Sequence, residues 1–267
     1  MAVKRLWFYI KLYPYFVSRS IQSRMSYKSD FILGVCASAL MQGLGYVFIW
    51  AVFQGIPEMN GWSFYQMVFV YGMAAISLGL NEFLFAGSWN VGKHVRDGSF
   101  DRLLLRPMGT LFSILAEDVA LHGIGSVLFG LAVCIVALFR LHLALSLGKI
   151  LFWIVAMACG SLIFFSVNIV CATVSFWVTD ISSAMVMVQN VSEFTKYPIA
   201  IYDRKLQVFL TYVIPFAFSS YYPVGFLLGM ESRPIYWLGP ILAAAAAVTV
   251  AALFWRYGTG KYQSAGG

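Results

Sequence analysis

The segment Ile150–Val178 reads ILFWIVAMACGSLIFFSVNIVCATVSFWV and contains no charged residue. A helix that crosses a bilayer needs roughly 20 mainly apolar residues, and this segment exceeds that length. Such a segment is typical of a membrane-spanning helix rather than of the core of a soluble domain. It decides the fold class, and the rest of the chain is interpreted outward from it.

The composition of the whole chain agrees with this segment. The 267 residues are 61% hydrophobic and 11% charged, whereas soluble domains carry roughly 25% charged residues. These figures exclude a disordered chain, a coiled coil and a disulfide-stapled secreted module. Although the pI is about 9.2, the 18 basic residues are too dilute to form a nucleic-acid groove. The sequence predicts an all-α integral membrane protein. Its expected partner is the lipid bilayer, and no nucleic-acid partner is expected.

Other segments of spanning length lie on both sides of Ile150–Val178. We predict a single transmembrane domain over residues 31–256, preceded by an amino-terminal arm at 1–30 and followed by a tail at 257–267. A polar loop at 88–108 and a re-entrant helical hairpin at 206–229, before the last span, interrupt it. Six transmembrane helices are expected at about 31–53, 63–86, 111–139, 150–178, 181–201 and 235–255.

Two segments compete to be the fifth span, 181–201 and 206–229. Segment 206–229 is apolar, but it contains Pro215 and Pro223, and a proline within a helix removes a hydrogen bond and kinks it. Irregular backbone at membrane depth persists only where protein or water covers it. We therefore expect 181–201 to cross inside the bundle and 206–229 to dip in and return. In the opposite assignment, which stays open, 206–229 crosses and the basic pair at 204–205 faces the cytoplasm.

The distribution of Lys and Arg predicts the orientation. The amino-terminal arm has six basic residues and the loop at 88–108 has four, whereas the first outer loop has none. Because positive charge accumulates on the cytoplasmic side, both termini are expected there. Aromatic and basic residues are mixed in the arm, which indicates a helix lying in the inner interface.

The sequence contains no pattern of a catalytic or metal site. His94, His122 and His142 are far apart, and the four cysteines lie inside apolar segments. The sequence Gly258-Thr-Gly-Lys261 resembles the end of a phosphate-binding loop, but Trp255 stands where the motif needs its first glycine. We expect a chain that is not an enzyme and binds no cofactor or metal itself.

Polar residues in the predicted fifth span form one stripe. Residues 189, 193 and 196 follow spacings of four and three, which place them on one helical face. Ionisable residues at membrane depth are costly and mark functional sites. The stripe lines a translocation path, or else Glu193 and Lys196 simply neutralise each other; both interpretations stay open. Its members are Gln189, Asn190, Glu193 and Lys196.

The polar loop contains a short amphipathic element, Asp97–Pro107, which reads DGSFDRLLLRP. Gly98 breaks one helix, Ser99 is placed to cap the next, and Asp101 lies in its first turn, where the helix dipole favours a negative charge. Such an element suits a docking site for a soluble partner, although a capped surface helix without a partner fits the same pattern.

Asp97–Pro107 resembles the inner loop of the type-2 export permeases of ATP-binding-cassette transporters, in particular a bacterial branch with paired permeases. A second similarity to that branch lies in the carboxy-terminal third, at Tyr197–Tyr202 (YPIAIY), Val213–Phe218 (VIPFAF) and Tyr221–Pro223 (YYP). The expected six spans and the interfacial arm fit the same family.

The resemblance implies a permease subunit of an exporter in a bacterial plasma (inner) membrane. Two copies of an ATP-binding-cassette ATPase would bind ATP and Mg²⁺ and drive alternating access, and a second, non-identical permease would complete the path. The cytoplasmic coupling helix would use Arg96, Asp97, Gly98, Phe100, Asp101, Arg102, Leu105 and Arg106. The hairpin would form the outer gate with Pro215, Phe216, Tyr221, Tyr222 and Pro223.

The alternative is an ion- or proton-coupled secondary transporter that uses Glu193, Lys196 and Glu82. Such carriers usually show internal repeats with paired broken helices, and this sequence has one broken segment and no repeat. The transported substrate stays open among lipids, glycolipids, peptides and drugs.

Overall fold

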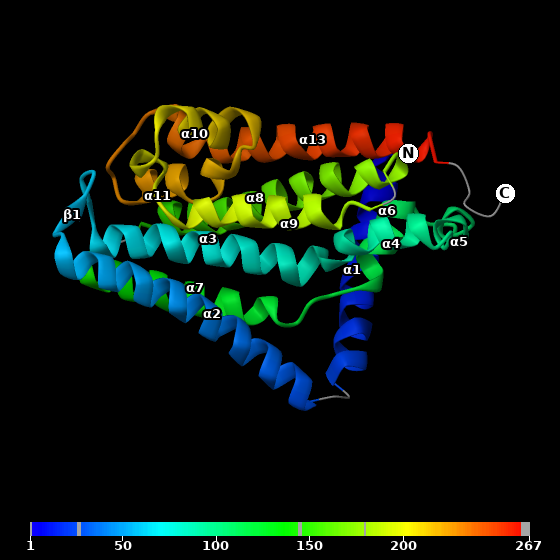
Figure 1. The fold of residues 1–267 in the computed structure, drawn as a ribbon, viewed down its shortest axis with the longest axis horizontal. Helices are drawn as coiled ribbons and strands as arrows, with labels where there is room; N and C mark the ends of the chain where they lie inside the picture. Colours follow the sequence, from blue (N-terminus) through cyan, green and yellow to red (C-terminus); the bar gives the residue numbers. More distant parts are fainter. Residues whose placement is uncertain (1, 26–27, 144–145, 179, 263–267) are drawn as a thin grey trace.

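The computed structural model describes residues 2–25, 28–143, 146–178 and 180–262, with side chains described at 11–22 and from 28 onward. The protein is an elongated bundle of helices (Figure 1), and the fold class predicted from the sequence is confirmed. At one end, β1 (Glu58–Met59) pairs with β2 (Trp62–Ser63) in a small antiparallel hairpin. Its turn, Asn60-Gly61, has positive φ angles of 48° and 78°, which is the backbone that an Asn-Gly turn accommodates.

Five helices among the described residues are long and apolar enough to cross a membrane. They form most of the bundle, and α3 lies at its centre with most of its side chains buried. They are α2 (Lys28–Gly55), α3 (Phe64–Phe85), α7 (Gly123–Arg140), α8 (Leu147–Thr173) and α13 (Gly239–Thr259).

The third predicted span, 111–139, is not one helix. Helix α6 (Thr110–Glu117) ends before the extended residue Asp118, and α7 begins only at Gly123. The physical reason is the acidic pair Glu117-Asp118, because both carboxylates are bound by polar side chains of the preceding loop. A continuous helix would have carried them away from these partners.

Segment 181–201 runs from one end of the bundle to the other. Ile181 lies against Gly92 near the polar loop, and the carbonyl of Ala200 accepts a 2.9 Å hydrogen bond from Asn60 in the β-hairpin. Its helical parts are short and do not count among the five spanning helices, so six spans stay a prediction. They are α9 (Ser182–Ser192), η3 (Glu193–Lys196) and η4 (Ile199–Ile201).

The segment predicted to be a re-entrant hairpin folds back on itself. After the turn at Ile214-Pro215 the chain returns toward the end from which it came. Pro223 does not break a helix, contrary to the expectation, because it occupies the first turn of α11, where a proline displaces no hydrogen bond. The elements are α10 (Arg204–Val208), the π-helical η5 (Phe209–Val213), η6 (Phe216–Ser219), α11 (Tyr221–Leu227) and α12 (Pro234–Trp237).

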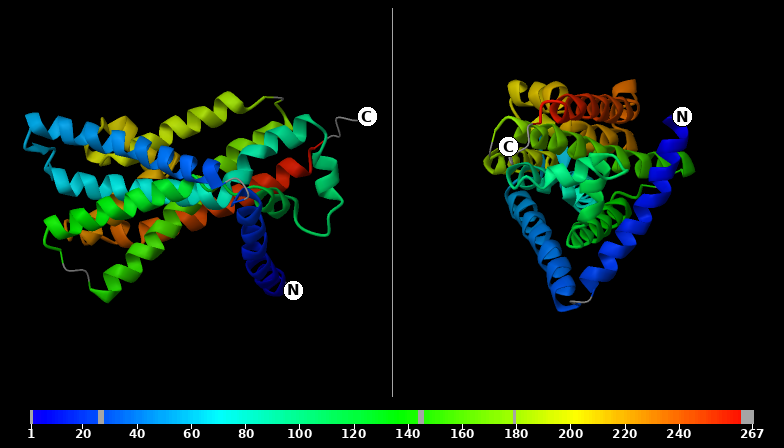
Figure 2. Two further views of the ribbon diagram at one scale, coloured as in Figure 1. Left: turned by 90° about the horizontal axis from the view of Figure 1, so that it is seen from below. Right: turned by 90° about the vertical axis from the view of Figure 1, so that its right-hand side faces the viewer.

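Helix α1 (Ala2–Met25) runs across the direction of the bundle at the end opposite the β-hairpin (Figures 1 and 2). The Tyr13 hydroxyl donates a hydrogen bond to the carbonyl of Leu84, and its ring meets Phe112 edge-on at 6.0 Å. This direction is the one expected of the interfacial arm. Residues 263–267 of the predicted tail lie outside the described part of the chain.

Helices α3 and α7 touch backbone to backbone along a seam of four glycines. A Cβ placed on Gly79 would lie 2.8 Å from the carbonyl oxygen of Gly123, and one on Gly123 would lie 2.6 Å from that of Gly79. Gly72 and Gly130 make the same reciprocal contact at 2.8 and 2.7 Å. Small residues permit such close approach in a membrane, where packing rather than water drives helix association.

We predict that Gly79→Leu lowers the free energy of unfolding by about 1–3 kcal/mol, because the side chain forces α3 and α7 apart. Gly148→Leu on α8 is the matched control, since the nearest atom to its added Cβ is Ser146 Oγ at 4.0 Å. Thermal unfolding in detergent measures both variants. Equal unfolding midpoints for the two variants would contradict the close contact of α3 and α7 at Gly79.

Candidate coupling element and translocation path

The polar loop forms two short helices around a left-handed glycine. After the turn η1 (Ala86–Asn90), α4 (Val91–Arg96) leads to Gly98 with φ +67°, a conformation that a side chain disfavours. The second helix, α5 (Phe100–Leu104), follows directly. Both helices lie at the end of the bundle opposite the β-hairpin (Figure 1). We name Val91–Leu105 the coupling element.

Ser99 does not cap α5, contrary to the expectation. Its backbone is already helical, with φ −70° and ψ −10°, whereas a capping residue is normally extended. Its hydroxyl lies instead 2.7 Å from His94 Nδ1. Ser99 therefore joins α5 to α4. Asp101 occupies the first turn of α5 as predicted.

An aromatic anchor fixes the coupling element to the ends of two spanning helices. The Phe100 side chain is completely buried, and its ring centroid lies 5.1 Å from that of Phe176, just after α8. Trp255 of α13 lies at 6.2 Å and Tyr262 at 4.8 Å. The Phe100 side chain therefore attaches α5 to the ends of α8 and α13 and has no exposed surface.

A second, ionic anchor joins the coupling element to α6. The Glu117 carboxylate accepts a hydrogen bond from Arg106 at 2.9 Å and lies 2.9 Å from His94 Nε2. Because one carboxylate bridges both sides of the element, it fixes the angle between α4 and the residues after α5. No residue type in the loop predicted this bridge, since Glu117 lies outside it.

The outward surface of the coupling element is left exposed by the two anchors. Leu105 is 86% exposed and Leu104 48% exposed, while Gly98 and Asp101 are half-buried. An exposed leucine pair at a polar end of the molecule is the kind of feature that a partner covers. The exposed charged residues around it are Arg96, Asp97, Arg102 and Arg106.

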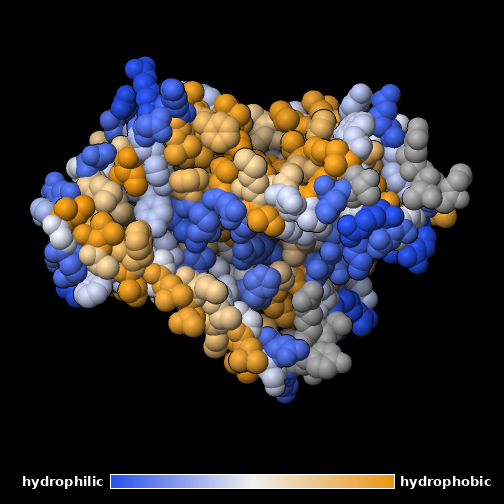
Figure 3. Space-filling view, viewed as in Figure 1, coloured by the Kyte–Doolittle hydropathy of each residue, from blue (hydrophilic) through white to orange (hydrophobic). Residues whose placement is uncertain are grey.

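The polar stripe of α9 lies on the surface at the middle of the bundle. In Figure 3 hydrophilic side chains gather over α9, between two hydrophobic bands. Lys196 Nζ lies 2.6 Å from a Glu193 carboxylate oxygen, so the pair does neutralise itself. The Glu82 side chain of α3 lies close to Gln189, Glu193 and Lys196. The structure therefore adds Glu82 to the stripe.

A network behind the stripe escaped the sequence analysis. Lys196 Nζ lies 5.7 Å above the Tyr71 ring, and the Tyr71 hydroxyl donates to Gln42 of α2, at 2.6 Å to its carbonyl. Gln42 also donates to Ser126 Oγ at 3.3 Å. The available signal was a lone glutamine within the apolar run 31–53, because a buried amide at membrane depth needs partners.

The stripe opens toward the β-hairpin end into a pocket of about 390 Å³ between α2 and η3. Its walls are largely apolar and aromatic, and Asn190 and Glu193 bring polar groups to it. Phe48 and Phe53 line the α2 side, and Tyr197 lines the other. The arrangement suits a passage for molecules with an apolar part. In the described part of the chain no three or more metal-binding side chains lie together.

The residues predicted as an outer gate lie in the re-entrant hairpin from its turn onward, in η6 and α11. Phe216 is buried against Phe164, with ring centroids 4.8 Å apart, and Tyr221 lies 5.5 Å from Trp62 of the β-hairpin. The Ser220 hydroxyl donates a 2.6 Å hydrogen bond to the carbonyl of Thr195 in η3. Through this bond the hairpin is tied to the polar stripe. Pro215, Tyr222 and Pro223 lie in the same unit.

The helices of spanning length in the described part of the chain define a multi-pass membrane protein. The sequence matches the family model described as ABC-2 family transporter protein over residues 39–266, which is most of the 267 residues. The chain belongs to this family, and the resemblance to type-2 export permeases is confirmed. A permease of this kind is a transport subunit that works with an ATP-binding-cassette ATPase. A comparison with curated proteins finds no match.

We predict that Glu117→Gln loosens the coupling element, because an amide cannot replace the charge that binds both Arg106 and His94. Amide hydrogen exchange of residues 94–106 should accelerate about fivefold, the effect of losing about 1 kcal/mol from a partly exposed ion pair. Glu231→Gln is the control, since it removes the Arg233 pair at the opposite end of the molecule. An unchanged exchange rate at 94–106 would refute the bridge.

Proposed function

We propose that this chain is the permease half of an exporter and that separate ATPase subunits drive it through the coupling element. The observation that carries the proposal is a rigidly anchored element with an exposed leucine surface at one end of the bundle. Two copies of the ATPase would bind ATP and Mg²⁺, and one of them would receive Leu104 and Leu105 of this chain in a surface groove. The exposed arginines would pair with acidic groups at its rim.

The two anchors support a mechanism in which the ATPase moves the spans as rigid bodies. Force applied to α5 reaches α8 and α13 through Phe100, because its ring touches the ends of both. Force also reaches α6 through Glu117. A packed aromatic cluster transmits displacement rather than absorbing it, since protein interiors have low compressibility. Closure of the ATPase dimer would thereby switch the bundle between inward- and outward-open states.

The exposure of the polar stripe supports the second permease of this proposal, which would cover it. Ionisable groups such as Glu193 face the bundle interior or a water-filled cavity in membrane proteins, not lipid. In this chain the stripe lies on the surface beside α2, which is itself little covered by the rest of the chain. A similar, non-identical permease facing α2 and α9 would enclose the path, with the pocket of about 390 Å³ as its outer part.

The hairpin would act as the outer gate. Its tie to η3 through Ser220 and its contact with Trp62 couple its turn to the outer end of the path. In this orientation the coupling element and both termini lie on the cytoplasmic side of a bacterial plasma membrane, and α9 with η3 is the fifth of six spans. The basic residues of the arm and of the polar loop then face the cytoplasm, as the charge rule requires.

One observation favours an ion- or proton-coupled secondary transporter instead. Glu82, Glu193 and Lys196 lie together at membrane depth, and such groups carry protons in many pumps. Dependence on an ATPase partner separates the two functions.

We predict that an ATP-binding-cassette ATPase co-purifies with the tagged chain from its native membrane. Arg102→Glu combined with Leu105→Glu should reduce the recovered ATPase at least about tenfold, or about 1.4 kcal/mol of binding, because both residues lie on the exposed surface. Lys261→Glu reverses a charge at the same end outside that surface. If the tagged chain is recovered without an ATPase, even after crosslinking, the secondary transporter is favoured. If the double variant recovers as much ATPase as the wild type, the docking site lies elsewhere on the chain.

We predict that Asn190→Cys reacts with a membrane-impermeant thiol reagent above the background of the four native cysteines. Asn190 lines the pocket beside α2 and would meet water in the path. Met187→Cys is the control on the same helix, because Met187 is 67% exposed but does not line that pocket. Mass spectrometry of the labelled peptide measures both. Equal labelling of the two would argue against a path along the stripe.

A further inference from the structure

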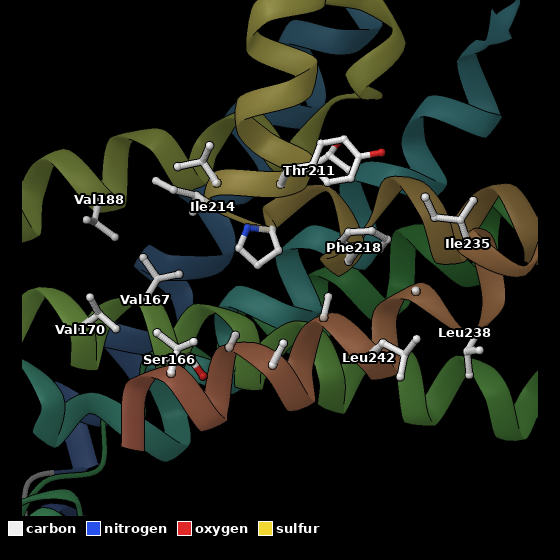
Figure 4. A pocket seen from close by; sticks show the side chains of 18 of the residues that line it. Ser166, Val167, Val170, Val188, Thr211, Ile214, Phe218, Ile235, Leu238 and Leu242 are labelled. Carbon is white, nitrogen blue, oxygen red and sulfur yellow. The ribbon is translucent and has the colours of Figure 1, made fainter. Parts of the chain in front are cut away.

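A large groove lies beneath the turn of the re-entrant hairpin. It measures about 880 Å³, which is within the range of roughly 300–1,000 Å³ for small-molecule sites. Figure 4 shows its construction: Val167 and Val170 of α8 and Val188 of α9 form one side, and Leu242 of α13 forms another. Thr211, Ile214 and Phe218 of the hairpin close it from above.

The lining offers a ligand almost no polar group. None of the residues that line the groove is charged. The Ser166 hydroxyl already donates to the carbonyl of Leu162 at 2.6 Å, and Thr211 is buried beside Tyr222. Tyr212 also belongs to the lining and is 72% exposed. Few polar groups are therefore present to replace the hydrogen bonds with water that a headgroup, a sugar or a peptide backbone would lose here. The chemistry therefore selects a hydrocarbon.

The face of α13 toward the groove contains a row of small residues between larger apolar ones such as Leu242 and Val250. Ala243, Ala246 and Ala247 follow the helical repeat and line the groove, while Gly239 at the end of the row lies against Phe218 of the re-entrant hairpin. Such a face normally permits two helices to approach closely, but here it leaves open space. An aliphatic chain is thin and flexible enough to follow this face and pass beneath the hairpin turn.

The open side of the groove is continuous with apolar surface at membrane depth. Leu242 and Val250 of α13 are each 58% exposed, and Val213 of the hairpin is 66% exposed. In a chain that spans the bilayer, these residues contact lipid tails, so hydrocarbon is present at the entrance without any transfer from water.

We propose that an acyl chain of a bilayer lipid occupies this groove and holds the turn of the re-entrant hairpin in place. The turn consists of a π-helix followed by Ile214-Pro215, and π-helical segments are frequent at functional sites. With the acyl chain bound, the sides of Ile214 and Pro215 that line the groove rest on hydrocarbon; without it, only the part of the turn that packs on the core is supported. The regulatory consequence, that lipid tails set the position of the outer gate, rests on the proposed function, whereas the binding site itself does not.

Photolabelling in nanodiscs tests the site with the full-length chain. The probe is a phosphatidylcholine with a diazirine on its acyl chain, and the labelled residues are mapped by mass spectrometry. We expect peptides with Val188, Leu242 and Val250 to be labelled at least about fivefold more than the α2 peptide with Leu40 and Met41, which is exposed to lipid when the chain is reconstituted by itself. Equal labelling of the two regions would overturn the proposal.

A pair of adjacent substitutions provides the matched control. Ala246→Trp places an indole in the groove, whereas Ala245→Trp, one residue earlier, lies outside the lining and is also exposed. Groove labelling should fall to the α2 level in Ala246→Trp and persist in Ala245→Trp, with both variants monodisperse on size exclusion. Equal labelling of the two variants, or crosslinks through these residues to a second protein chain, would refute an acyl site.

Hydrogen exchange of the hairpin tests the consequence. In detergent stripped of lipid, residues 209–219 should exchange more slowly in Ala246→Trp than in the wild type or in Ala245→Trp, because the indole substitutes for the acyl chain. Equal exchange in all three would show that the groove binds a tail without supporting the turn. Recovery of the ATPase with the same variants tests the permease assignment separately, so failure of one proposal is distinguishable from failure of the other.

Discussion

The close contact between α3 and α7 is the constraint on which the other features depend. Gly72 and Gly79 meet Gly130 and Gly123 so closely that no side chain fits between the two backbones. In a bilayer, where apolar surface gains little by leaving lipid, such backbone contact is a main source of helix association. Once α3 is fixed at the centre, α8 packs on one side of it and α2 on another. Both the coupling element and the polar stripe are then positioned by helices that contact α3.

The two ends of the molecule are built differently, and the difference follows from charge. At the end with the coupling element, Glu117, Arg106 and His94 connect short helices that are too short to be stable alone. At the β-hairpin end, aromatic contacts and the hydrogen bond from Ser220 to Thr195 connect the segments instead. Phe100 connects α5 to Phe176 after α8 and to Trp255 of α13, and Phe164 of α8 packs on Phe216 of the re-entrant hairpin, so α8 contacts structures at both ends.

The surface of the bundle divides into two kinds of membrane contact. The stripe over α9 is polar, while the groove beneath the re-entrant hairpin is lined by uncharged and mostly apolar residues. Val188 of the groove and Gln189 of the stripe are consecutive on α9, so the two environments meet along one helix. Both surfaces therefore depend on the position of α9.

The sequence by itself determined the class of protein, the spanning segments without internal charge and the glycine break of the coupling element, because apolar length and local backbone preference are properties of contiguous residues. It also placed residues 189, 193 and 196 on one face, since helical periodicity is local. The break before Gly123, the burial of Phe100, the bridge through Glu117 and the addition of Glu82 to the stripe were decided only by the tertiary structure. Each of these depends on side chains far apart in the chain, and no spacing within one segment reports which distant partner will satisfy a charge or fill a gap.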